Sequence, residues 1–266
     1  MSLPTLTPDW RWQEAAGRPY LTCTLLASWP HGFFTQHFAG QSPAVLTHYL
    51  APEAQAYRVR QVHGNTVLTP TVPESLAETA AQAWPEADGL LTEAPGQAVW
   101  VASADCTPVL IADSETGRVA ALHAGWRGTA QRIVPVAIAK LLALGSRLTH
   151  LRVALGPAIA GEVYQVSEAV AAAVGASVVP PERVTEPAAI CAELQAQAAS
   201  PILPDPEPGR LRLDVRRMIQ LQLQQLGFTP AQVAQAPLCT YQQPELFFSY
   251  RRTQQKQVQW SGIVSR

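Results

Sequence analysis

Residues 121–129 read ALHAGWRGT: an apolar, strand-like run ends in His123, and a glycine-rich turn leads from it into a helical pattern. Turns between strands and helices are where α/β proteins place much of their chemistry. A histidine at the end of a buried strand can also be an ordinary core residue. The rest of the sequence has to decide between these two interpretations.

Further strand-like and helical runs surround this stretch. Apolar and β-branched runs closed by Gly, Asp or Pro predict strands at 57–64, 98–106, 107–113, 117–125, 150–159, 247–252 and 257–265. Helical spacing predicts helices at 128–145, 164–176 and 213–227, the first of them beginning or kinking at Pro135. Because strands and helices are mixed without strict βαβ alternation, we predict an α/β (α+β) fold with a mixed central sheet layered with helices.

The chain shows no clear internal boundary, so we expect a single domain over residues 1–266. Within it, residues 1–25 are expected to form an N-terminal extension. Residues 180–209 are rich in proline and predict a surface excursion with a short helix around 187–199.

Composition excludes several classes of protein. With 47% hydrophobic and 15% charged residues the chain can bury a sizeable core. A net charge of -1 without a basic stripe predicts no nucleic-acid partner. We find no apolar run long enough for a membrane helix and no secretory signal pattern. Four scattered cysteines do not form a disulfide framework, so we expect a cytoplasmic protein.

Three residues stand out because each ends a strand-like run: His63, Cys106 and His123. If these strands are neighbours in one sheet, their ends meet. Two imidazoles and a thiolate suit zinc, and a fourth position left open is typical of a catalytic site. Taken one by one, His63 can be a turn residue, Cys106 a small buried hydrophobe and His123 a core residue.

Other polar residues near these positions are candidates for the same site. Asp105 is a candidate to orient a ligand histidine, to accept a proton or only to cap a turn. Arg127 precedes a predicted helix, where a guanidinium and free backbone amides suit phosphate; the alternative is a surface arginine. Tyr164, Tyr250 and Arg251 are candidates for shaping a substrate pocket.

From about His31 to the end, the chain resembles the YfiH family in the order of six motifs. These motifs are RQVHGNTV, EADGLLT, ADCTPVLIAD, LHAGWRGT, LGPAI…YQV and CT…FFSYRR. That family carries the labels laccase-domain protein, polyphenol oxidase, peptidoglycan editing factor and purine nucleoside phosphorylase. The resemblance implies that His63, Cys106 and His123 bind one zinc. It also implies a fold similar to the deamidase domain of cytotoxic necrotizing factors.

The resemblance implies an enzyme that phosphorolyses purine nucleosides and deaminates adenosine, with nucleoside and phosphate as its partners, acting as a monomer or homodimer. One alternative is copper-dependent phenol oxidation, although a copper cluster consumes many histidines and this chain has only six. Another is thiol chemistry with Cys106 as nucleophile and His123 as base. A non-enzymatic cell-wall role has no discriminating feature in the sequence.

The sequence also departs from the family pattern. Gln36 stands where an arginine is usual, Ile219 and Gln220 replace an Asn-Arg pair, and QVQWSGIV lacks the usual Thr-Gly-Arg. We therefore expect an intact metal site beside a partly rebuilt substrate or oligomer surface.

Overall fold

The computed structural model describes residues 3–71, 84–180, 182–183 and 185–266. Among these residues the strands form two six-stranded sheets and one of three strands. The first sheet consists, in spatial order, of β1 Trp10–Ala15, β2 Arg18–Cys23, β3 His31–Phe34, β15 Gln259–Val264, β7 Gln97–Ser103 and β4 Gln55–Tyr57. The second consists of β14 Val233–Gln235, β10 Leu151–Leu155, β8 Thr107–Asp113, β9 Val119–Ala124, β6 Gly89–Leu91 and β5 Val67–Leu68.

The small sheet and the helices complete the described fold. The small sheet has the order β11 Gln165–Ser167, β13 Arg210–Leu213 and β12 Ile202–Pro204. The α-helices are α1 Pro43–Leu50, α3 Trp126–Ala130, α4 Ile133–Ala143, α5 Glu168–Gly175, α6 Pro187–Gln195, α7 Val215–Gln225 and α8 Tyr250–Thr253. None of the described helices is both long and apolar enough to cross a membrane.

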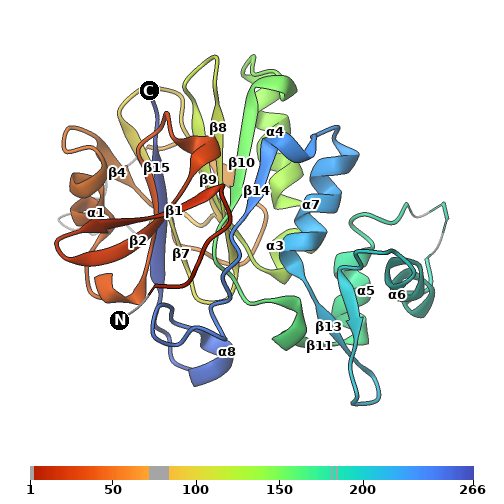
Figure 1. The fold of residues 1–266 in the computed structure, drawn as a ribbon. Coiled ribbons are helices and arrows are strands. Elements are labelled where there is room, and N and C mark those ends of the chain that lie inside the picture. The colour runs from red at the N-terminus through yellow and green to blue at the C-terminus, as the bar shows by residue number, and fades with distance from the viewer. Residues whose placement is uncertain (1–2, 72–83, 181, 184) are drawn as a thin grey trace.

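The two large sheets pack face to face, and helices cover their outer faces (Figure 1). Alternation along the strands builds these layers. In β7, Val99 and Val101 belong to the core between the sheets, whereas Trp100 packs in the cluster that includes Leu46 of α1. Both faces of β8 are covered, and all seven of its residues are buried.

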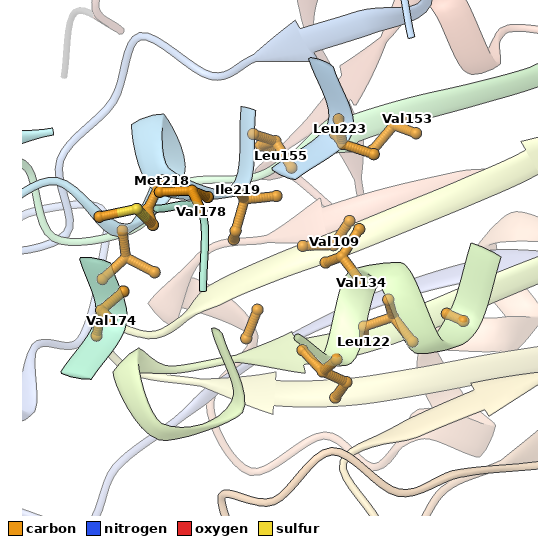
Figure 2. Close-up of a cluster of buried hydrophobic side chains, with 14 of the residues drawn as sticks. Val109, Leu122, Val134, Val153, Leu155, Val174, Val178, Met218, Ile219 and Leu223 are labelled. Carbon is orange, nitrogen blue, oxygen red and sulfur yellow. The ribbon is translucent and has the colours of Figure 1, made fainter. Parts of the chain in front are cut away.

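A large cluster of apolar side chains forms the core between the second sheet and its helices (Figure 2). Val109 of β8 and Leu122 of β9 lie in this cluster with Val134 of α4 and with Ile219 and Leu223 of α7. Burying one such side chain is worth about 1.5–3 kcal/mol, so this layer fixes β9 and the turn that follows it.

The mixed α+β fold is confirmed, with the mixed pairing spread over two sheets instead of one central sheet. β4 pairs with β7 in parallel and β10 with β14 in parallel, while the neighbouring pairs β7–β15 and β8–β9 are antiparallel. The predictions of strands at 98–106, 107–113, 117–125, 150–159 and 257–265 are confirmed by β7, β8, β9, β10 and β15. The helix at 213–227 is confirmed by α7, whose first turn is capped by Asp214.

Four predicted elements differ from the structure. The helix expected over 164–176 begins only at Glu168, because Gln165–Ser167 form strand β11, which pairs with β13. The strand expected over 57–64 is wrong beyond Tyr57, the last residue of β4: Arg60 forms only an isolated bridge, and the backbone at 62–64 turns toward a buried carboxylate described below. The strand expected over 247–252 is wrong: Ser249 caps the short helix α8 by accepting from Arg252 N at 3.2 Å. The helix expected over 128–145 is divided at Arg132, whose φ of 61° is left-handed, so the break precedes Pro135.

Two expected segments contain regular structure. Residues 10–23, within the expected N-terminal extension, form the β1–β2 hairpin that pairs with β3 at the edge of the first sheet. The expected excursion over 180–209 contains α6 and β12, so the short helix is present. Residues 1–2, 181 and 184 of these two segments lie outside the described residues. The single-domain organisation stays a prediction.

Candidate metal centre

The structure brings His63, Cys106 and His123 together, with their ligand atoms within 4.8 Å of one another. His63 lies in the loop between β4 and β5, Cys106 in the turn between β7 and β8, and His123 in β9. The two imidazole rings are 4.8 Å apart and nearly perpendicular. Because β7 and β8 belong to different sheets, the ligands meet where the chain crosses between sheets, not at adjacent strand ends of one sheet.

Two glycines give the three ligands room. A Cβ atom at Gly125 would lie 2.8 Å from Cys106 Sγ, and one at Gly128 would lie 2.8 Å from the carbonyl oxygen of Gly64. Gly125 has an ordinary φ of -76°. The glycine of the HAGW motif is therefore required for close approach and not for a left-handed turn.

Asp88 connects the two histidine ligands. Its fully buried carboxylate bonds His123 Nδ1 through Oδ1 at 2.9 Å and accepts the backbone N–H of His63 at 2.9 Å. It also accepts from the backbone N–H groups of Gly64 at 2.6 Å and Val62 at 3.2 Å through Oδ2. Sequence reasoning missed this role, although the motif EADGLLT holds the residue; an acidic residue before a glycine and an apolar strand was the available signal.

The charges of the site depend on one another. Burial disfavours the thiolate of Cys106, but the nearby His123 and His63 outweigh burial and lower its pKa to about 6. Burial likewise disfavours a charged His123, but Cys106 and Asp88 raise its pKa to about 9. Burial opposes ionisation of Asp88 too, and the hydrogen bonds from His123 and the His63 turn still lower its pKa. Without a metal the site thus favours a Cys106 thiolate beside a protonated His123.

A cleft of about 710 Å³ opens at this cluster. His63, Cys106 and His123 line it together with Tyr250 of α8 and Trp260 of β15. The other lining residues are Arg58, Val59, Gln61, Ala102, Ser103, Ala104, Gln255, Lys256, Gln257 and Val258. A mostly apolar cleft with a few convergent polar groups is the usual form of a small-molecule site.

Arg127, Tyr164 and Arg251 form a second group near the cluster. The guanidinium of Arg251 lies 4.9 Å from the centre of the Tyr164 ring and donates to the carbonyl oxygen of Gln165 at 2.8 Å. Burial and the nearby Cys106 raise the pKa of Tyr164 to about 12, against the opposing charges of Arg251 and Arg127. Arg127 is exposed and stacks on its neighbour Trp126 at 4.5 Å. Only Tyr250, of the four predicted substrate contacts, is among the residues lining the cleft.

Asp105 has different partners from the ones its position suggested. Its carboxylate accepts from Thr240 Oγ1 and from the backbone N–H of Arg251, both at 2.7 Å. Its φ of 89° is left-handed, a conformation that Asp tolerates better than most residues. Asp105 thus anchors Thr240 and the first turn of α8, and the hydrogen bond that orients His123 comes from Asp88.

The structure shows what the residues at two departures from the family pattern contact. Gln36 donates from Nε2 to the carbonyl oxygen of Pro244 at 2.7 Å, and Ile219 is fully buried in the core of the second sheet. Gln220 Oε1 accepts from Arg217 at 3.2 Å on α7. These residues contribute packing and local hydrogen bonds.

The fold and the cluster together define an α+β protein with two packed sheets and a candidate metal site, and comparison with known proteins identifies the family. The family model described as multi-copper polyphenol oxidoreductase laccase matches residues 41–265. The chain belongs to this family, the YfiH family.

Relatives and solved structures agree with this assignment. The chain is 57% identical over 256 residues to a protein of Synechocystis named purine nucleoside phosphorylase, covering 96% of this chain and 97% of the relative. The crystal structure of YlmD from Geobacillus stearothermophilus is similar with a TM-score of 0.79 and 26% identity, over 96% of this chain and 98% of that one. That of the Bacillus licheniformis protein YfiH has a TM-score of 0.77 at 23% identity, over 96% and 99%, and supports the fold.

Proposed function

We propose that this protein phosphorolyses purine nucleosides at the centre formed by His63, Cys106 and His123. The observation that carries the proposal is a three-ligand cluster, with ligand atoms within 4.8 Å, at the wall of a cleft large enough for a nucleoside. The proposal is also supported by a relative named purine nucleoside phosphorylase, which is 57% identical to this chain over nearly the whole of both chains.

The residues fit a zinc ion. Cys106 supplies a thiolate, His123 keeps one ring nitrogen after bonding Asp88, and His63 is exposed on the cleft side. Two imidazoles and a thiolate match a known ligand set of catalytic zinc. A zinc ion bound there would supply a Lewis acid beside the substrate.

The chain's own residues would position the two substrates. The cleft wall formed by Ala102, Ser103 and Trp260 offers small and aromatic surface to a purine and its ribose. Arg127, at the glycine-flanked start of α3, is proposed to bind phosphate with Arg251 and Tyr164 nearby. Tyr250 lies on the same cleft as the metal ligands and is proposed to contact the nucleoside.

Deamination of adenosine is the finer part of the proposal. It needs water and a proton acceptor beside the base but no phosphate. The two reactions can therefore be separated by leaving phosphate out, and adenosine is the substrate on which both are measured.

Copper oxidation receives support from the family model's description alone. A Cys-His₂ set also suits a blue-copper centre, whose usual weak axial ligand is a methionine. Of the two methionines in the chain, Met218 is buried in the core of the second sheet and Met1 lies outside the described residues. Within the described part of the chain, one cluster of three metal-binding side chains is found, where a multi-copper enzyme needs more.

Thiol catalysis is favoured by one specific observation. Cys106, with a pKa of about 6, stands beside His123, with a pKa of about 9, so the metal-free protein holds a thiolate–imidazolium pair. Cys106→Asp separates the two proposals. A carboxylate can still ligate zinc and retain part of the activity, whereas loss of a nucleophile abolishes turnover.

The direct test is the metal content of protein purified without added metal, followed by assays of inosine and adenosine with and without phosphate. About one zinc per chain and phosphate-dependent release of free base are expected. A metal-stripped sample with full activity would refute the zinc proposal in favour of the thiol, and three or more coppers per chain would favour the oxidase. The cytoplasmic location and the monomer or homodimer state stay predictions.

A further inference from the structure

We infer that Asp88 is a positioning residue that fixes which nitrogen of His123 ligates the metal and, with the same carboxylate, shapes the turn that presents His63. The inference rests on the metal part of the proposed function. It concerns one buried side chain that is in contact with both histidine elements of the site.

The tautomer of His123 follows from the chemistry of its partner. An ionised carboxylate has no hydrogen to donate, so His123 Nδ1 must be the donor in its 2.9 Å hydrogen bond to Asp88 Oδ1. The proton on Nδ1 is thereby held in place, so a metal that binds His123 displaces the proton from Nε2, the ring nitrogen not bonded to Asp88. A second contact fixes the backbone as well, because His123 N donates to the carbonyl oxygen of Asp88 at 2.7 Å.

The same carboxylate holds the His63 turn. The backbone N–H groups of Val62, His63 and Gly64 all converge on Asp88, at 3.2, 2.9 and 2.6 Å. His63 has a left-handed φ of 62°, a conformation that is uncommon outside glycine. Three converging hydrogen bonds offset that strain, and they end the strand-like run before the ligand.

Asp88→Asn is a sharp test because no orientation of an amide reproduces these contacts. If the amide nitrogen faces Gly64, two backbone N–H groups meet a donor. If the amide nitrogen faces His123, it also meets the backbone N–H of His63, which is a second donor. The amide then donates to His123 Nδ1, so the ring proton moves to Nε2 and blocks ligation there. Either way the site is perturbed while the size of the side chain is kept.

Asp113 provides the matched control. Asp113 is equally buried and is the last residue of β8, about 20 Å along the strand from Cys106. Its carboxylate accepts from the backbone N–H groups of Glu115 and Thr116. Asp113→Asn therefore imposes the same chemical change on a buried turn without touching the ligands.

The experiment measures zinc affinity of wild type, Asp88→Asn and Asp113→Asn by competition with a chromophoric chelator, with the unfolding of each zinc-free protein recorded alongside. We expect Asp88→Asn to weaken zinc binding by about 10–100-fold and Asp113→Asn to leave it unchanged. Equal affinity of wild type and Asp88→Asn, or an equal loss in both variants, would overturn the inference. A wild type that binds no zinc would instead refute the metal proposal itself.

A measurement on the wild-type protein keeps the test independent of whether the variant folds. Nitrogen-15 NMR of the histidine rings in the zinc-loaded protein should show His123 protonated on Nδ1, with zinc on Nε2. Zinc on Nδ1, or a proton on Nε2, would overturn the role of Asp88 even if the variant cannot be purified.

Discussion

Two acidic residues flank the three ligands, and they serve different regions of the molecule. Asp88 lies far from every ligand in sequence yet contacts His123 and the His63 turn. Asp105 is adjacent to Cys106 in sequence, yet its carboxylate bonds Thr240 and, in the first turn of α8, the backbone of Arg251. We call these two regions the ligand side and the α8 side.

The difference between the two sides teaches that tertiary contacts, and not sequence adjacency, assign the role of a buried carboxylate. Both residues accept backbone N–H groups and both support an uncommon backbone conformation, at His63 on the ligand side and at Asp105 itself on the α8 side. Changes on the ligand side should therefore alter metal binding. Changes on the α8 side should alter substrate handling and stability, with the metal retained.

The largest expected effect is loss of a ligand. His63→Ala or His123→Ala removes one of three protein ligands, so zinc affinity should fall by more than the roughly 10–100-fold that supporting residues cost. Arg251→Ala, on the α8 side, should keep about one zinc per chain. Elemental analysis and chelator competition measure both, and loss of zinc in Arg251→Ala would break the distinction between the two sides.

A smaller effect is expected at Arg127, which lies near Tyr164 and Arg251. Loss of a charge-assisted hydrogen bond to phosphate costs about 1.5–3 kcal/mol, so Arg127→Ala should slow phosphorolysis by about ten- to a hundredfold with zinc retained. Adenosine deamination should change less, because it uses no phosphate. Rates of both reactions on one variant provide the check: an equal fall in both points to a structural role for Arg127, and no change points to a surface charge.

Much of the fold was predictable because its signals are local. Alternation and β-branched runs predicted β7, β8, β9 and β15, and the amphipathic period predicted α7. The errors arise where a tertiary contact overrides a local preference. Apolar residues at 247–252 look like a strand, but Ser249 caps a helical turn there, and Asp105 accepts from its first turn. The division of strands between two sheets depends on long-range pairing that spacing does not encode.

The site was predictable to a similar degree. Residue chemistry and family resemblance singled out His63, Cys106 and His123, and the structure brings them together. The contacts of Asp88 join residues 25 and 35 positions away, so the local pattern around Asp88 marks the residue but does not reveal its partners. The requirement for Gly125 is also invisible in the sequence, because it comes from the Cys106 sulfur packed against it.

An effect of about tenfold is expected in the reactivity of Cys106. With a pKa of about 6 the thiol of zinc-free protein is a thiolate above pH 6 and is protonated as the pH falls through that value. Alkylation by iodoacetamide should therefore reach half its maximum rate near pH 6 and should be blocked by zinc. In His123→Ala the midpoint should rise by at least about one pH unit. At a pH below both midpoints, the thiolate fraction and the alkylation rate should then be about tenfold lower than in the wild type. A midpoint near the ordinary value of 9.0 in wild type would contradict this account of the ligand side.

The smallest effect should come from Asp105→Asn, which tests the α8 side alone. Asn tolerates the left-handed φ of 89° and keeps one carbonyl acceptor, so the substitution removes charge and one acceptor without forcing the backbone to move. With the Asn carbonyl on the backbone N–H of Arg251, the amide nitrogen donates to Thr240 Oγ1, so both contacts can remain but neither involves a charged group, and we expect the free energy of unfolding to fall by about 1–2 kcal/mol. Because Tyr250 lies on α8 and lines the cleft, KM for the nucleoside should rise by a few-fold while zinc content stays at that of the wild type.

Urea unfolding, elemental analysis and steady-state kinetics on one preparation separate these quantities. Zinc loss as large as in Asp88→Asn would show that Asp105 supports the ligands after all, and the two carboxylates would then serve one region instead of two.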